Sequence, residues 1–160
     1  IEPSACPSLT KGKFAYDFGD TGGMTPLVKM HTLGSNFIPS GFHAGGLRYH
    51  GMAPIVSHLV NNGYVNPESY TQLDVFKAGL LFAKNEGIIP APEANHAVKG
   101  AIEAALRAKE SGENKTILFN LCGHGNFDMQ AYTYYFEGKL FDQEYSDEEI
   151  GMALSGLPSV

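Results

Sequence analysis

The chain has 160 residues, 43% of them hydrophobic, which is enough to bury one core. Eleven Lys and Arg against 17 Asp and Glu give a formal net charge of -6, so we expect small-molecule or protein partners and no nucleic acid. Cys6 and Cys122 are too few for a disulfide framework and lack metal-site spacing, which favours a reducing compartment such as the cytoplasm. No apolar run approaches the length of a membrane span, so we expect no membrane partner.

The first fifty residues mix short strands with loops. Residues 1–10 have a loop composition, and a start at Ile1 indicates a fragment or a processed piece. Residues 14–18 predict a short strand, whereas residues 25–33 are ambiguous. Residues 35–51 hold four glycines and two histidines without periodicity, and such long loops tend to be functional. His43 and His50 are therefore candidate ligands or acid–base groups, although buried histidines that only pack give the same pattern.

Three helices are predicted in the middle of the chain. The first begins at Pro54 and turns apolar residues inward, and it ends at residues 61–63. The second begins at Thr71 with a capping-box-like pattern and ends at Gly87, where a left-handed cap fits. The third begins at Glu93, after a short strand, and runs to about residue 110.

The start of the third helix is a candidate site. Glu93 and His96 lie one helical turn apart at a strand-to-helix junction. A carboxylate in the first turn is also favoured by the helix dipole alone, and His96 could simply be packed in the core. Further on, residues 129–136 predict an aromatic helix against the core, and Ser146 with Glu149 predicts the start of a last helix.

Residues 116–128, TILFNLCGHGNFD, are the most informative stretch. Residues 117–121 are apolar except Asn120 and have polar or glycine flanks, as in a strand covered on both faces of a parallel sheet. Ligands bind beyond the carboxyl ends of such strands, where Gly123 and Gly125 let a backbone approach closely. A plain strand-to-loop turn gives the same pattern. We predict a single α/β unit over residues 1–160, a three-layer parallel sheet with flanking helices.

We do not expect Cys122 and His124 to form a catalytic nucleophile pair. Side chains so close in an extended turn point apart, which seldom brings the sulfur within hydrogen-bond reach of the ring. The phosphate-loop, dinucleotide-binding, zinc-protease and serine-hydrolase motifs are absent from the sequence.

Four ordered blocks resemble the carboxyl-terminal part of the tryptophan synthase β chain, in its second, β-like branch. They are IEPSACPSLTKGKFAYDFGD at 1–20, HTLGSNFIPSGFHAGGLRYHGMAPIVSHL at 31–59, EGIIPAPEANHA at 86–97 and ILFNLCGHGNFDMQAY at 117–132. The resemblance implies a lyase of tryptophan biosynthesis with the fold of type II pyridoxal-phosphate enzymes. Such enzymes replace the hydroxyl of serine with indole.

The resemblance assigns cofactor contacts to three residues. Cys122 matches the position where the family usually has a Ser that hydrogen-bonds the pyridine nitrogen of pyridoxal phosphate. Sulfur makes a weaker hydrogen bond, so this contact should be weaker here. Glu93 matches the family's Glu near the cofactor ring, and Gly123 matches the glycine that closes over it.

The resemblance also assigns substrate and cation contacts. Asn36 lies near the position of a family Asp that engages the substrate amino acid, and a neutral amide cannot form the same ion pair. We expect His124 to contact the substrate as well. Backbone carbonyls around Phe37 and Ser40 resemble the family's monovalent-cation loop.

The family's Schiff-base lysine, its neighbouring acid–base Glu and its phosphate cradle have no counterpart in this sequence. The chain alone should therefore be inactive and should not bind the cofactor tightly. We expect it to pair with a missing upstream portion of the enzyme or to form a homodimer through exposed apolar faces. Two alternatives remain open: β-replacement with a sulfur nucleophile, and a non-catalytic α/β binding or assembly module.

Overall fold

The computed structural model describes residues 1–159, which divide into two compact units. The helical unit comprises Ile1 and residues 42–46 and 70–143, and the hairpin unit comprises residues 2–41, 47–69 and 144 onward. The helical unit contains α2 (Gln72–Glu86), α3 (Pro92–Ser111), the short 3-10 helix η2 (Gly125–Phe127) and α4 (Met129–Phe136). The other helices and strands are β1 (Glu2–Pro3), β2 (Lys13–Asp17), β3 (Val28–Thr32), η1 (Gly45–Leu47), α1 (Pro54–Asn61), β4 (Ser69–Tyr70) and α5 (Asp147–Leu154).

The hairpin unit is organised around the antiparallel pair of β2 and β3, in which Lys13 lies opposite Thr32. The strand predicted at residues 14–18 is confirmed within one residue, and the ambiguous stretch that follows is also a strand. A buried polar contact ties the pair together, because the Thr32 hydroxyl donates to the Asp17 carboxylate at 2.6 Å.

Both predicted helices of the hairpin unit are present. In α5 the Ser146 hydroxyl accepts from the Glu149 amide at 3.2 Å, and the Glu149 carboxylate accepts from the Ser146 amide at 2.8 Å, as in a capping box. In α1 the expected inward apolar face is confirmed only in part, because Met52, Val56, Leu59 and Val60 are half-buried. Ile55 is 76% exposed, whereas the buried residue is Ser57, whose hydroxyl accepts a hydrogen bond from the His31 amide.

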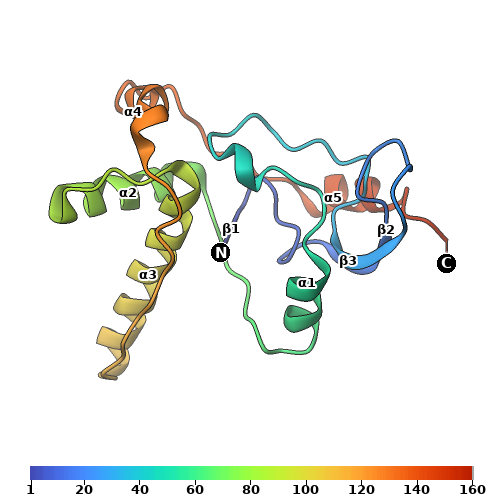
Figure 1. The fold of residues 1–160 in the computed structure, drawn as a ribbon, viewed down its shortest axis with the longest axis horizontal. Coiled ribbons are helices and arrows are strands. Elements are labelled where there is room, and N and C mark those ends of the chain that lie inside the picture. Colours follow the sequence, from blue (N-terminus) through green and yellow to red (C-terminus); the bar gives the residue numbers. More distant parts are fainter. Residues whose placement is uncertain (160) are drawn as a thin grey trace. The chain divides into compact units, whose positions relative to one another are not determined.

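The predicted helices of the helical unit are confirmed (Figure 1). The Thr71 hydroxyl caps α2 by accepting from the Asp74 amide, and Gly87 ends the helix at a φ of 72°. A close approach fixes the packing of α2 on α3, because a Cβ on Gly79 would collide with the side-chain amide of Asn95. Only glycine therefore fits at this position of α2.

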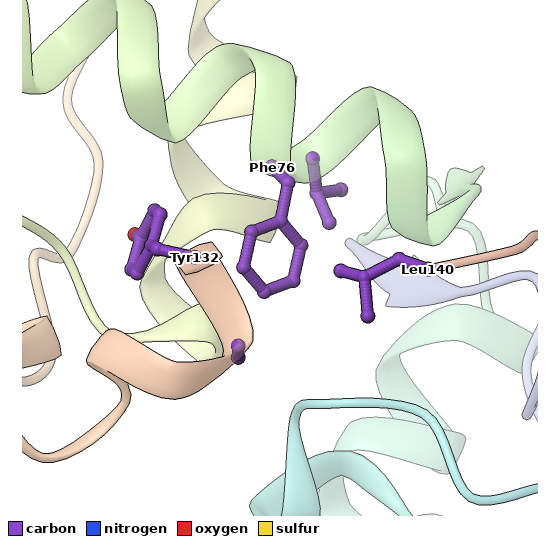
Figure 2. Close-up of a cluster of buried hydrophobic side chains, with 5 residues drawn as sticks. Phe76, Tyr132 and Leu140 are labelled. Carbon is purple, nitrogen blue, oxygen red and sulfur yellow. The ribbon is translucent and has the colours of Figure 1, made fainter. Parts of the chain in front are cut away.

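The core of the helical unit is aromatic and lies between α2 and α4 (Figure 2). The Phe76 ring meets Tyr132 edge-on at 5.1 Å and stacks on Tyr135 at 5.8 Å. Leu140 closes the same cluster. The predicted aromatic helix thus packs on the core through Tyr132, although Phe136 is 70% exposed.

The central strand predicted at residues 117–121 is wrong for the described part of this chain. The run is extended but belongs to no sheet, and Leu118 is 93% exposed. One side chain does pack, since the Phe119 ring meets Phe82 of α2 edge-on at 5.7 Å. In Figure 1 the run turns back beside α3 on its way to α4. A strand needs neighbours to bond its backbone, and the described residues supply none.

The α/β composition is confirmed, but the described residues do not build the predicted three-layer parallel sheet. They form two separate two-stranded pairs, β1 with β4 and β2 with β3, and the second pair is antiparallel.

Candidate functional site

Two segments predicted to carry the site meet in the helical unit. The turn at residues 122–125 lies against residues 89–91, which lead into α3. The Ala91 amide donates to the Gly123 carbonyl at 3.1 Å, and the Gly125 amide donates to the Ile89 carbonyl at 2.7 Å. Pro90 and His124 form an antiparallel bridge between these bonds. Cys122 and Glu93 therefore flank the same short backbone pairing, although they lie 29 positions apart in the sequence.

The two glycines of this turn are required by its geometry. Gly123 has a φ of 101°, and a Cβ there would lie 3.3 Å from the Ala91 side chain. A Cβ on Gly125 would lie 2.5 Å from the Pro90 carbonyl oxygen. Any larger residue would force the turn away from the start of α3, so these glycines keep the two segments together.

Glu93 is half-buried in the first turn of α3 and holds a loop of the same unit. Its carboxylate accepts a hydrogen bond from the Gly46 amide at 2.9 Å. No side chain caps α3. Glu93 therefore does not cap α3 with a hydrogen bond. Its carboxylate is favoured by the helix dipole and accepts its hydrogen bond from another segment.

Cys122 and His124 both lie at the exposed side of the turn. Cys122 is a free thiol. The His124 Nδ1 accepts from the Asn126 amide at 3.2 Å, and its ring lies 5.4 Å from the exposed ring of Phe127. In the described part of the chain no hydrogen bond joins the Cys122 sulfur to the His124 ring, as expected for side chains that point apart.

A buried polar network supports the turn from behind. The Tyr132 hydroxyl donates to the Pro90 carbonyl at 2.6 Å, and the Asn95 side-chain amide donates to that hydroxyl at 3.0 Å. Burial raises the pKa of Tyr132, so the phenol remains protonated and can donate. Sequence reasoning did not predict this network. The signal that could have indicated it is Gly79, a glycine inside α2 that packs against Asn95.

His96 lies in the first turns of α3 and is buried there, which confirms the prediction that it could simply be packed in the core. Its side chain is 3% exposed and its Nδ1 lies 2.9 Å from the Pro92 carbonyl oxygen. Burial lowers the pKa of His96, which favours the neutral ring. A neutral ring that donates from Nδ1 presents Nε2 as an acceptor, and this buried nitrogen has no partner among the described residues.

The remaining predicted site residues, Asn36, Phe37 and Ser40, belong to the hairpin unit. Asn36 is exposed and Phe37 is buried. The Ser40 hydroxyl oxygen is buried and has no hydrogen-bond partner within the described residues. This orphaned oxygen lies in the loop predicted to bind a monovalent cation.

The two histidines of the long loop belong to different units, and each makes its own hydrogen bond. The His43 amide donates to the Gln72 side chain at 2.8 Å, within the helical unit. In the hairpin unit the His50 ring bonds the Phe18 carbonyl at 2.8 Å. No cluster of three or more His, Cys, Asp or Glu side chains suited to a metal ion occurs over residues 1–159. Within the same range, none of the helices is both long and apolar enough to span a membrane.

The sequence was compared with known proteins. No family model matches it. Tryptophan synthase beta chain 2 of Aquifex aeolicus is 59% identical over 142 residues, which are 89% of this chain and 33% of that protein. The protein of the same name from Methanosarcina acetivorans is 60% identical over 88% of this chain and 32% of its own length. That of Pyrococcus furiosus is 53% identical over 99% of this chain and 35% of its own length.

The chain spans about a third of the length of these relatives. Along about nine tenths of its own residues, the chain is thus homologous to one third of the tryptophan synthase β chain.

Proposed function

We propose that the chain is the carboxyl-terminal portion of a tryptophan synthase β-type lyase that joins serine and indole to make tryptophan. The identity of 53–60% over nearly the whole chain carries this proposal. We call the chain joined to the remaining two thirds of its relatives' length the complete protein. In the complete protein, pyridoxal phosphate would supply the electron sink for β-replacement.

The turn at residues 122–125 would form the wall beside the cofactor ring. Support comes from the backbone pairing of this turn with residues 89–91, which holds Cys122 and Gly123 next to the start of α3. The exposed Cys122 thiol would donate a weak hydrogen bond to the ring nitrogen. A weak neutral donor leaves that nitrogen unprotonated and moderates the electron sink. Glu93, fixed by the Gly46 amide at 2.9 Å, would lie beside the ring.

The substrate and a cation would be held partly by this chain. We assign His124 and Asn36 to the substrate and the carbonyl oxygens of Phe37 and Ser40 to a monovalent cation. The buried, unpartnered hydroxyl of Ser40 supports a polar occupant beside this loop. Backbone carbonyls suit such a cation because they replace its hydration shell.

The extended run at residues 117–121 would complete its hydrogen bonds in the complete protein. Its exposed Leu118 and its Phe119, packed on Phe82, suit a strand covered on both faces. We propose that residues 117–121 join a parallel sheet built mainly by the remaining two thirds, so that residues 1–160 act as one α/β unit within the complete protein. The complete protein would form a homodimer.

An assay of the complete protein tests this function. We expect tryptophan to form from serine and indole, and little product to form when sulfide replaces indole. Preferential use of sulfide would contradict the assignment of indole as the nucleophile. Cys122→Ser should keep activity and shift the visible spectrum of the bound cofactor, because a hydroxyl makes a stronger hydrogen bond. An unchanged spectrum in both Cys122→Ser and Cys122→Ala would contradict the ring-nitrogen contact.

A further inference from the structure

A tyrosine far along the chain holds the loop at residues 36–40 of the hairpin unit. The Tyr145 hydroxyl accepts from the Ser40 amide at 3.0 Å and donates to the Ile38 carbonyl at 3.4 Å. The Tyr145 ring meets Phe37 edge-on at 5.0 Å. One side chain therefore contacts two backbone groups of the loop and its buried aromatic residue.

Tyr145 is itself fixed on the opposite side. The Lys11 ammonium donates to the Tyr145 carbonyl at 2.8 Å and pairs with Asp147 at 3.4 Å. The next residue, Ser146, begins α5 with its capping box. Because the backbone on both sides of Tyr145 is anchored, its hydroxyl has a defined position from which to hold the loop.

Through its hydroxyl, Tyr145 bonds one carbonyl of the loop. It occupies the carbonyl of Ile38. The carbonyls of Phe37 and Ser40 receive no hydrogen bond within the described residues, and the Ser40 hydroxyl is buried without a partner. Both residues are those assigned to a monovalent cation.

We propose that Tyr145 is a positioning residue for this cation loop. By fixing the Ser40 amide and the Ile38 carbonyl, it keeps the carbonyls of Phe37 and Ser40 available to one cation. Preorganised ligands bind more tightly because the loop does not lose freedom when the cation arrives. The inference rests on the proposed function, which assigns the cation to this loop.

The test compares Tyr145→Phe with wild type in the complete protein. Tyr145→Phe keeps the ring on Phe37 and removes only the hydroxyl. The matched control is Tyr64→Phe in the same unit, because Tyr64 is 78% exposed. Potassium affinity is measured from the melting temperature during titration with KCl, with choline chloride keeping the ionic strength constant. Hydrogen exchange of the peptide that contains Ser40 is measured in parallel.

We expect Tyr145→Phe to weaken potassium binding roughly tenfold and to speed exchange at Ser40, as loss of one hydrogen-bonding hydroxyl predicts. Tyr64→Phe should change neither quantity. Lys11→Met, which frees the Tyr145 carbonyl and leaves the hydroxyl, should weaken binding by a smaller factor of roughly three.

The outcomes separate the inference from the proposed function. Wild-type affinity in both Tyr145→Phe and Lys11→Met would overturn the positioning role and leave the cation loop standing. A wild-type protein whose melting temperature ignores potassium would overturn the cation loop, and the role of Tyr145 with it. Faster exchange at Ser40 with unchanged affinity would assign Tyr145 to loop stability only and would also overturn the inference.

Discussion

Two regions of the helical unit lie next to the candidate site and differ in how completely the described residues supply their hydrogen bonds and packing. The support behind the turn is complete: Tyr132 and Asn95 bond each other, and Tyr132 bonds the Pro90 carbonyl in a buried setting. The run at residues 117–121, which leads into the same turn, has an exposed apolar face and no strand beside it. Within the described residues, the polar support behind the turn is therefore complete, whereas the run that leads into the turn has no strand paired with it.

A pair of leucine variants should show this contrast most strongly. Leu140→Ser removes a buried member of the aromatic core and should cost about 4 kcal/mol of unfolding free energy. Leu118→Ser replaces an exposed side chain and should change it by less than about 0.5 kcal/mol. Urea unfolding of the chain measures both. An equal loss in the two variants would mean that residues 117–121 are already packed in this chain.

The close approach of α2 to α3 gives the next largest effect. Gly79→Ala would push a methyl group into the Asn95 side chain and should destabilise the chain by about 3 kcal/mol. Gly41→Ala is the control, because a Cβ there meets nothing within 4 Å and the backbone is not left-handed. Thermal unfolding compares them. A tolerated Gly79→Ala would show that the helices do not pack at this distance.

The polar network behind the turn should contribute less. Tyr132→Phe removes the donor to Pro90 and the acceptor for Asn95, at a cost of about 2 kcal/mol. In the matched variant Tyr134→Phe, the lost hydroxyl accepts only an exposed bond from Gln130, so the cost should stay below about 0.5 kcal/mol. Denaturant midpoints report both costs. If the two variants lose the same stability, the network does not support the turn.

The smallest effect concerns pH. Burial lowers the pKa of His96 in the folded chain, so the unfolded chain takes up its proton first as the pH falls. His96 therefore permits full stability above its unfolded pKa of about 6.5, and stability is lost as the pH falls toward the folded pKa, by at most about 1.4 kcal/mol per unit. His96→Gln should flatten the curve below pH 6.5, whereas the exposed control His58→Gln should keep the wild-type slope. Parallel slopes in all three proteins would contradict a neutral buried His96.

Local signals in the sequence predicted the helices well. Thr71, Gly87 and Ser146 mark helix ends through contacts with residues three or four positions away, and such contacts leave a pattern in the sequence. The apolar residues of α1 predicted the helix and most of its inner face, but Ile55 is exposed. An apolar pattern indicates which residues can be buried, whereas the partner that buries them is set elsewhere in the fold.

Contacts between distant residues account for what sequence reasoning missed. The composition of residues 117–121 is typical of a buried strand, but pairing depends on partner strands that the described residues do not supply. The Asn95–Tyr132 bond joins residues 37 positions apart and leaves no periodic trace. Tyr145 contacts Ser40 across 105 positions, so its role was not predictable from local patterns either.

Cofactor binding by the chain alone and by the complete protein tests the central claim most directly. Each is dialysed to equilibrium against pyridoxal phosphate, and the retained cofactor is read from its visible absorbance. We predict stoichiometric retention by the complete protein and none by the chain alone, because the proposed function assigns the covalent anchor of the cofactor to the remaining two thirds of the complete protein. Stoichiometric retention by the chain alone, or none by the complete protein, would contradict the account.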